Sequence, residues 1–147
     1  MFNHESPLRH EKFISKKIVQ AAVNIKHGKQ DVLILGDLKS EVDWGYAPDY
    51  VDAMQRILNV SKADDFIIAT GKKHSVLEFT KSAFHALNMD WAAYAKEDST
   101  LLKKPDYTRI GDSSKLRAIT GWAPSITFEE MIGLFVNHEI SQVKDER

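Results

Sequence analysis

The run DVLILG at residues 31–36 is the stretch that indicates the fold most clearly. Its consecutive branched apolar side chains, ended by a glycine, are typical of a strand buried on both faces. A second run, DFIIAT at residues 65–70 followed by Gly71, has the same character. Helical patterns surround both runs. Strands that alternate with helices predict an α/β fold with parallel pairing.

Five helices are expected from spacing and capping signals. The first covers residues 12–27, and Pro48 stands in the first turn of the second, where a missing N–H costs little. Capping-box spacings begin the third helix at Ser75 and the last at Thr127. A short helix after residues 112–114 ends at Gly121. The expected apolar stripe of the second helix consists of Tyr50, Val51, Met54, Ile57 and Leu58.

The number of strands is too small for the number of helices. A two-stranded parallel sheet leaves both edges open and cannot cover five amphipathic helices. Either strands are missing or a partner supplies them. Residues 90–110 show no clear period, and residues 1–140 are expected to form one unit that ends in a frayed polar tail at residues 141–147.

Composition narrows the class of protein. The chain has 147 residues, with 20 basic and 21 acidic side chains, and this balance gives no support to a nucleic-acid partner. It has no cysteine, no apolar run of about 18 residues and no signal-peptide pattern, which predicts a soluble cytoplasmic protein without membrane association. Residues 1–30 carry an excess of four positive charges. That excess fits either an anionic ligand or a solvated helix face.

The motifs of common catalytic sites are absent from the sequence. It contains no glycine-rich nucleotide loop, no G-x-S-x-G elbow and no Tyr-x-x-x-Lys pair. The six histidines lack metal-ligand spacing. We therefore predict neither a catalytic residue nor a metal site in this chain.

A series of short motifs nevertheless resembles one enzyme family. In order along the chain, the motifs are FNHESP (2–7), FISKKI (13–18), LGDL (35–38), DWGYA (43–47), DYV (49–51), IATG (68–71), HSV (74–76), GD (111–112) and GW (121–122). Together they closely resemble the GDP-mannose 4,6-dehydratases, which are extended short-chain dehydrogenase/reductases. The resemblance implies the carboxyl-terminal, substrate-binding part of such an enzyme, with an incomplete Rossmann sheet, about five helices and few short strands. The family's glycine-rich NADP loop and catalytic residues precede this part.

The resemblance also implies roles for seven residues. By position in the motifs, the nucleotide sugar is contacted by Asn3, Ile14, Lys17, Lys103 and Asp106, and NADP by His4 and Arg9. At two places the sequence departs from the pattern of the family. Val42 occupies the place of a family arginine, and residues 103–106 (KKPD) replace an Arg-Pro-x-Glu segment that holds the guanosine. Valine offers no donor, and lysine lacks the bidentate guanidinium.

The expected function follows from this resemblance. The complete enzyme would be a hydro-lyase of deoxysugar (GDP-fucose) biosynthesis that converts GDP-mannose to GDP-4-keto-6-deoxymannose with NADP. This chain alone is expected to bind GDP-mannose or a related GDP-sugar, to hold NADP weakly and to be inactive. The alternative is a non-catalytic module that binds a nucleotide sugar or complements a separate Rossmann-domain half. A homo-oligomer and a gene fragment without a stable fold are further alternatives.

Overall fold

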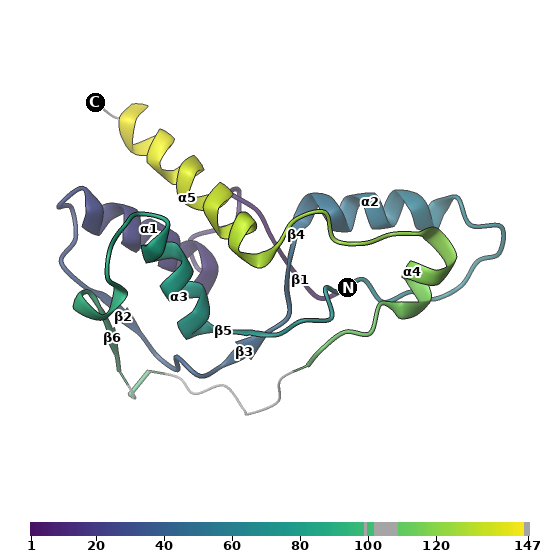
Figure 1. Cartoon of the computed structure of the whole chain (residues 1–147), viewed down its shortest axis with the longest axis horizontal. Helices are drawn as coiled ribbons and strands as arrows, with labels where there is room; N and C mark the ends of the chain where they lie inside the picture. The colour runs from purple at the N-terminus through teal and green to yellow at the C-terminus, as the bar shows by residue number, and fades with distance from the viewer. Residues whose placement is uncertain (99, 102–108, 146–147) are drawn as a thin grey trace.

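The computed structural model describes residues 1–98, 100–101 and 109–145 (Figure 1). The predicted site residues Lys103 and Asp106 lie outside the described residues. The described part contains five α-helices, one short 3-10 helix and six short strands. The predicted α/β class, with about five helices and few short strands, is confirmed.

The elements alternate along the chain. The helices are α1 (Ile14–Lys26), α2 (Ala47–Leu58), α3 (Val76–His85), α4 (Ser114–Thr120) and α5 (Phe128–Asp145), with the 3-10 helix η1 at Trp91–Ala93. The strands are β1 (Asn3–Glu5), β2 (Leu33–Leu35), β3 (Glu41–Val42), β4 (Trp44–Tyr46), β5 (His74–Ser75) and β6 (Ala95–Glu97).

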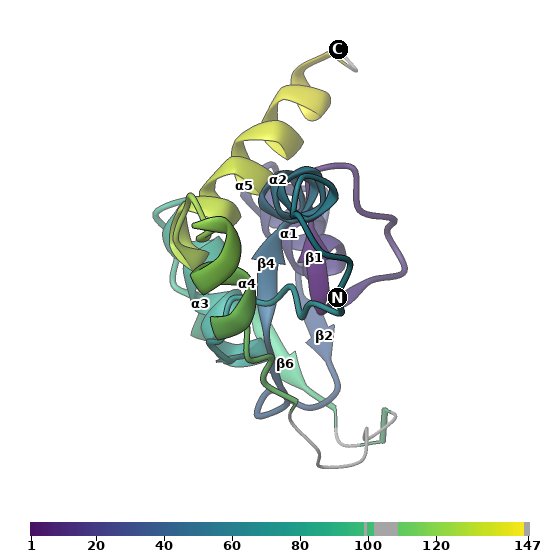
Figure 2. The ribbon, with the colours of Figure 1, turned by 90° about the vertical axis from the view of Figure 1, so that its right-hand side faces the viewer.

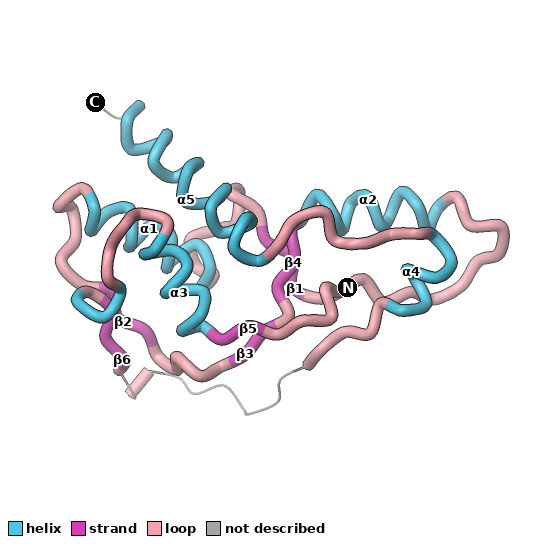
Figure 3. The backbone as a smooth tube through the Cα atoms, viewed as in Figure 1, coloured by secondary structure: helices cyan, strands magenta, loops and turns pink. Residues whose placement is uncertain are grey.

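The strands form three separate pairs (Figure 3). β1 pairs with β4 and β2 pairs with β6, both in parallel, and β3 pairs with β5 in antiparallel. The prediction that residues 65–70 form a strand is wrong. The Phe2 amide donates to the Ile68 carbonyl at 2.9 Å, but no described strand forms a ladder with this segment. Its apolar residues are still buried, since Ile68 and Ala69 are almost fully covered.

Two apolar cores hold together the helices whose arrangement is drawn in Figures 1 and 2. The larger lies among α1, α3 and α5 and includes Ile18, Phe79 and Ile132. The smaller lies under α2 and α4 and consists of Tyr50, Ala53, Ile68, Leu116 and Trp122. Helix α2 packs beside the β1–β4 pair.

The helix ends follow the predicted signals. Ser75 and Glu78 form the capping box of α3, and Thr127 and Glu130 form the same reciprocal hydrogen bonds before α5. Gly121 ends α4 with a φ of 66°, in the left-handed region that favours glycine.

The structure differs from two expectations of the sequence. The tail predicted from residue 141 is helical through Asp145, because Val143 packs into the larger core with only 7% of its surface exposed. The apolar stripe expected on α2 is buried at one residue and exposed at others. Tyr50 is buried, whereas Val51, Met54 and Leu58 are exposed. No helix in the described ranges has the length and apolar character needed to cross a membrane.

Candidate functional site

The predicted ligand residues at the start of the chain lie on a segment fixed by one buried carboxylate. Glu5 ends β1 and is 3% exposed. The Ser15 hydroxyl donates to Glu5 Oε2 at 2.6 Å, and Arg9 Nε lies 3.3 Å from the same oxygen. Burial raises the pKa of Glu5, while the Ser15 hydrogen bond and the Arg9 charge act in the opposite direction. Glu5 therefore ties β1, the following loop and α1 into one unit.

The predicted ligand residues of this segment, Asn3, His4 and Arg9, differ in their exposure and in their contacts with the rest of the chain. Asn3 is exposed on β1. The ring of His4 lies 5.6 Å from that of Tyr50, and its Nδ1 is 3.2 Å from the Phe2 carbonyl oxygen. The Arg9 guanidinium lies over the ring of Phe13, 3.4 Å from its centroid. His4 and Arg9 thus contact their own chain, and Asn3 presents its amide to the outside.

Helix α1 places Ile14 and Lys17 one turn apart. Ile14 begins the helix and packs against the larger core. Lys17 is exposed, and its Nζ donates to the Ile34 carbonyl of β2 at 2.8 Å. A cavity of about 540 Å³ lies there between α1 and β2. The polar residues that line it are Glu11, Lys12, Lys17, Gln20, Asn24 and Gln30.

The predicted site residues within the described ranges lie on β1, on the loop after it and on α1, which Glu5 holds together. Asn3 and His4 lie on β1 beside α2, whereas Lys17 is bonded to β2. No hydrogen bond or ion pair within the described ranges joins Asn3 to Lys17. Val42 pairs with His74 across β3 and β5 and packs partly against the larger core, so it supplies no donor in place of the family's arginine.

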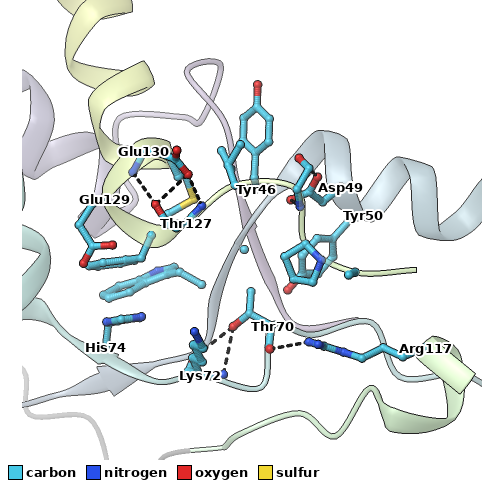
Figure 4. A pocket seen from close by; sticks show the side chains of 18 residues that line it. Tyr46, Asp49, Tyr50, Thr70, Lys72, His74, Arg117, Thr127, Glu129 and Glu130 are labelled. Atoms are coloured by element: carbon cyan, nitrogen blue, oxygen red, sulfur yellow. Dashed lines mark hydrogen bonds between the residues drawn. The ribbon is translucent and has the colours of Figure 1, made fainter. Parts of the chain in front are cut away.

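A pocket that the sequence did not predict lies between β4, the start of α2 and the segment before α5 (Figure 4). Its volume is about 550 Å³, and none of the predicted site residues that the structure describes lines it. The lining residues with polar or charged side chains are Asp49, Tyr50, Thr70, Lys72, His74, Arg117, Ser125, Thr127, Glu129 and Glu130, with Tyr46 and Trp44 among the aromatic ones.

Two carboxylates hold the walls of this pocket. Asp43 accepts hydrogen bonds from the Thr70 amide and hydroxyl and from the amides of Gly71 and Gly111. Asp49 accepts from the amide and hydroxyl of Ser125, at 3.0 and 2.5 Å. Each carboxylate joins segments that are distant in sequence. The pocket is consequently a product of tertiary contacts.

The Tyr50 hydroxyl is the least satisfied polar group of the pocket. It is buried, and among the described residues it has no hydrogen-bond partner. Burial and the negative charges of Asp43 and Asp49 raise its pKa above the ordinary value, so the phenol stays protonated and can donate. Gly45 leaves the space for this ring, because a Cβ there would lie 2.3 Å from Tyr50 Cε2.

The remaining side chains line the pocket with both aromatic rings and charged groups. The rings of His74 and Phe128 are stacked with centroids 3.8 Å apart. The Arg117 Nη2 donates to the Thr70 carbonyl at 2.9 Å. The available signals were the motifs DWGYA, DYV at residues 49–51 and GW at residues 121–122. They supported the resemblance but gave no indication that Trp122 Nε1 donates to the Asp49 carbonyl.

Comparison with solved structures defines the class of fold. The structure of RMD from Pseudomonas aeruginosa complexed with NADPH superposes with a TM-score of 0.86 at 20% identity, over 95% of this chain and 46% of that one. The UDP-glucose 4-epimerase of Thermotoga maritima with UDP-glucose gives a TM-score of 0.78 at 21% identity, over 97% and 45% of the two chains. The fold is that of part of an extended short-chain dehydrogenase/reductase.

Sequence comparison gives the family. The family model described as GDP-mannose 4,6 dehydratase matches residues 1–134. The chain is 38% identical to GDP-mannose 4,6 dehydratase 2 of Arabidopsis thaliana, over 100% of this chain and 40% of that protein. It is 35% identical to the GDP-mannose 4,6-dehydratase of Yersinia enterocolitica, over 98% and 46% of the two. This chain belongs to the GDP-mannose 4,6-dehydratase family and spans less than half the length of these relatives.

Proposed function

We propose that this chain is the carboxyl-terminal, nucleotide-sugar-binding portion of a GDP-mannose 4,6-dehydratase-like enzyme and does not catalyse the reaction alone. In the complete enzyme the sugar would be oxidised at C4, water would be eliminated across C5–C6 and a hydride would be returned to C6; NADP, when bound, would supply the hydride chemistry. The family match over residues 1–134 supports the substrate class. The sequence supplies no glycine-rich loop and no Tyr-x-x-x-Lys pair for the redox steps.

Lys17 is the residue on which the binding proposal depends most. Its ammonium group has three N–H donors, and the Ile34 carbonyl holds it at 2.8 Å in an exposed position above a polar cavity. A diphosphate that reached it would gain a charge-assisted hydrogen bond without ordering the side chain first. The exposed Asn3 offers both a donor and an acceptor to sugar hydroxyls.

The fit to NADP is partial. Bound NADP would supply the hydride acceptor at C4, and its phosphates would need donors that face them. Arg9 is the cation proposed for this role, but its guanidinium is paired with Glu5 and lies over Phe13. His4 is half-buried against Tyr50. Both residues suit the edge of a cofactor site rather than its phosphate cradle, which agrees with weak NADP binding by this chain alone.

Calorimetric titration with GDP-mannose tests the binding proposal. We expect wild-type chain to bind, and Lys17→Ala to weaken binding at least about tenfold, the loss of one charge-assisted hydrogen bond. Lys26→Ala is the matched control, since Lys26 is an exposed lysine in the last turn of the same helix. Absence of binding, or equal effects of the two substitutions, would contradict the proposal.

A separate experiment tests the proposal that this chain alone is inactive. Purified chain incubated with GDP-mannose and NADP is expected to form no 4-keto-6-deoxy product. Robust turnover would show that the reactive groups are in this chain after all.

A second candidate function is a non-catalytic module that complements a separate Rossmann-domain half. The observation that favours it is that the parallel β1–β4 sheet has only two strands in the described part of the chain, fewer than a complete parallel sheet. Capture of a Rossmann-domain protein supports complementation, whereas a monomer that binds GDP-sugar supports an independent binding module.

A further inference from the structure

The pocket between β4, α2 and the segment before α5 contains a polar group that the proposed function does not use. This group is the hydroxyl of Tyr50, a residue that is 1% exposed, and it has no hydrogen-bond partner among the described residues. In Figure 4 the hydroxyl points into the pocket, toward the side formed by Thr70. A buried O–H group without a partner is costly, and a ligand atom that accepts from it removes the cost. The Tyr50 hydroxyl therefore indicates a ligand with an acceptor atom at this place.

The charges around the phenol indicate that this acceptor is neutral. Burial raises the pKa of Tyr50, and the nearby charges of Asp43 and Asp49 raise it further. The phenol is therefore a donor, and an anion placed on it would be repelled by both carboxylates. A hydroxyl or ring oxygen of a sugar accepts from the phenol without adding a charge there.

Two cations stand beside Thr70 on one side of the pocket (Figure 4). Arg117 Nη2 donates to the Thr70 carbonyl at 2.9 Å, and its Nε donates to the Ser113 hydroxyl at 3.0 Å. Further N–H donors of this guanidinium remain, in an orientation that the two bonds fix. Lys72 is exposed, and within the described ranges its ammonium group has no hydrogen bond or ion pair. A fixed guanidinium and an ammonium group on one wall suit a phosphate.

The opposite wall of the pocket is the start of α5, and it carries two carboxylates (Figure 4). Glu130 accepts from the amide and the hydroxyl of Thr127, at 2.7 and 2.9 Å. Glu129 is exposed and has no partner in the part of the chain that the structure describes. The stacked rings of His74 and Phe128 line the same wall. This wall disfavours a phosphate, and its unpaired carboxylate beside aromatic rings suits the hydroxyl groups of a sugar.

We propose that this pocket binds a small sugar phosphate. The phosphate contacts Lys72 and Arg117, a sugar oxygen accepts from Tyr50, and a sugar hydroxyl donates to Glu129. The volume of about 550 Å³ lies in the range of small-molecule sites. None of the nucleotide-sugar residues within the described ranges lines the pocket, so this inference does not depend on the proposed function.

Calorimetric titration of the full chain with glucose 6-phosphate and glucose 1-phosphate tests this site. We expect at least one of them to bind with a Kd below about 1 mM. Glucose and inorganic phosphate are expected to bind at least about tenfold more weakly, because each makes only part of the contacts. Lys72→Ala is expected to weaken binding of the sugar phosphate at least about tenfold, the loss of a charge-assisted hydrogen bond.

Lys73→Ala is the matched control for Lys72→Ala. Lys73 is the next residue along the chain, its removal changes the net charge equally, and it pairs with Glu41 instead of lining the pocket. Lys73→Ala is expected to bind the sugar phosphate like wild type.

Tyr50→Phe separates a ligand-binding role of the phenol from a structural one. The substitution removes only a hydroxyl that has no partner among the described residues, so the melting temperature without ligand is expected to be unchanged or higher. Binding of the sugar phosphate is expected to weaken at least about fivefold, the loss of one neutral hydrogen bond. A lower melting temperature without ligand would show that the fold itself uses the hydroxyl, and would overturn the inference.

Three further results would overturn it. They are absence of binding of both sugar phosphates, equal binding by Lys72→Ala and Lys73→Ala, and binding of glucose or inorganic phosphate as tight as that of the sugar phosphates. Lys17→Ala keeps this proposal apart from the proposed function, because it is expected to weaken binding of GDP-mannose and to leave binding of the sugar phosphate unchanged. Absence of GDP-mannose binding with intact sugar-phosphate binding refutes the proposed function alone, and the reverse refutes this inference alone.

Discussion

Removal of the Asp43 carboxylate is the sharpest test of how this fold is held together. Asp43 is 1% exposed and lies between β3 and β4. It accepts hydrogen bonds from Thr70 N at 3.1 Å, Thr70 Oγ1 at 2.6 Å, Gly71 N at 3.1 Å and Gly111 N at 3.2 Å. One side chain thus joins the β3–β4 turn to two segments 27 to 68 residues away in sequence.

The size of the destabilisation expected for Asp43→Ala follows from these four hydrogen-bond donors. A hydrogen bond to a charged group contributes about 1.5–3 kcal/mol, and buried donors left without a partner are costly. Because the four share one carboxylate, their effects do not add in full. We expect Asp43→Ala to lower the free energy of unfolding by at least about 3 kcal/mol, which is a fall in melting temperature of about 6–12 °C for a domain of this size.

Urea unfolding followed by circular dichroism measures this loss. Asp52→Ala is the control, since Asp52 is a half-exposed carboxylate paired with Arg56 on the surface, a contact with little effect on stability. The reasoning is refuted if Asp43→Ala and Asp52→Ala unfold within about 1 kcal/mol of each other. A disordered pocket wall in Asp43→Ala would also raise the exchange rates of the Thr70 and Gly71 amides.

Three further predictions concern Gly45, Ser75 and Glu5, and Gly133 supplies a control. Gly45→Ala is expected to destabilise by about 1–3 kcal/mol in urea unfolding, because its Cβ would overlap the buried Tyr50 ring. Gly133→Ala, whose Cβ would meet nothing within 4 Å, should be neutral or stabilising. Ser75→Ala removes the cap of α3 and should cost about 1 kcal/mol in thermal melting; an unchanged melting temperature would contradict the capping role. For Glu5, burial raises the pKa in the folded state, so its contribution to stability is present below the ordinary value of 4.5 and is lost as pH rises through the raised pKa. The melting temperature of Glu5→Gln relative to wild type should therefore increase from pH 4.5 to pH 7, and a constant difference would refute the assignment.

Local signals in the sequence determined the helices well. The capping boxes at Ser75 and Thr127 and the left-handed Gly121 fix helix ends through hydrogen bonds within a few residues, so no tertiary contact is needed to recognise them. The shortage of strands was also evident from the sequence, and the three two-stranded pairs confirm it in the described residues.

What the sequence could not decide is which surfaces face each other. Residues 65–70 have the composition of a strand, but a strand requires a ladder with a neighbour, and these residues make one bond from Phe2 to Ile68. The helical period of α2 groups Tyr50 with Val51, Met54, Ile57 and Leu58. Only Tyr50 is buried and Ile57 is partly covered, because covering a stripe depends on which element packs over it.

The predicted ligand residues and the pocket lined by Tyr50 also differ in how far the sequence could predict them. Sequence motifs named Asn3 and Lys17 as ligand residues, and the structure places Asn3 on β1 and Lys17 on α1, where its Nζ donates to the Ile34 carbonyl of β2. The pocket behind Tyr50 was not predicted, because Asp43 and Asp49 assemble it from segments far apart in the chain. The sequence by itself determined the family and the helices, since both depend on residues close together along the chain. Only the tertiary structure decided the pocket and the exposure of Val51, Met54 and Leu58 on α2, since both depend on long-range contacts.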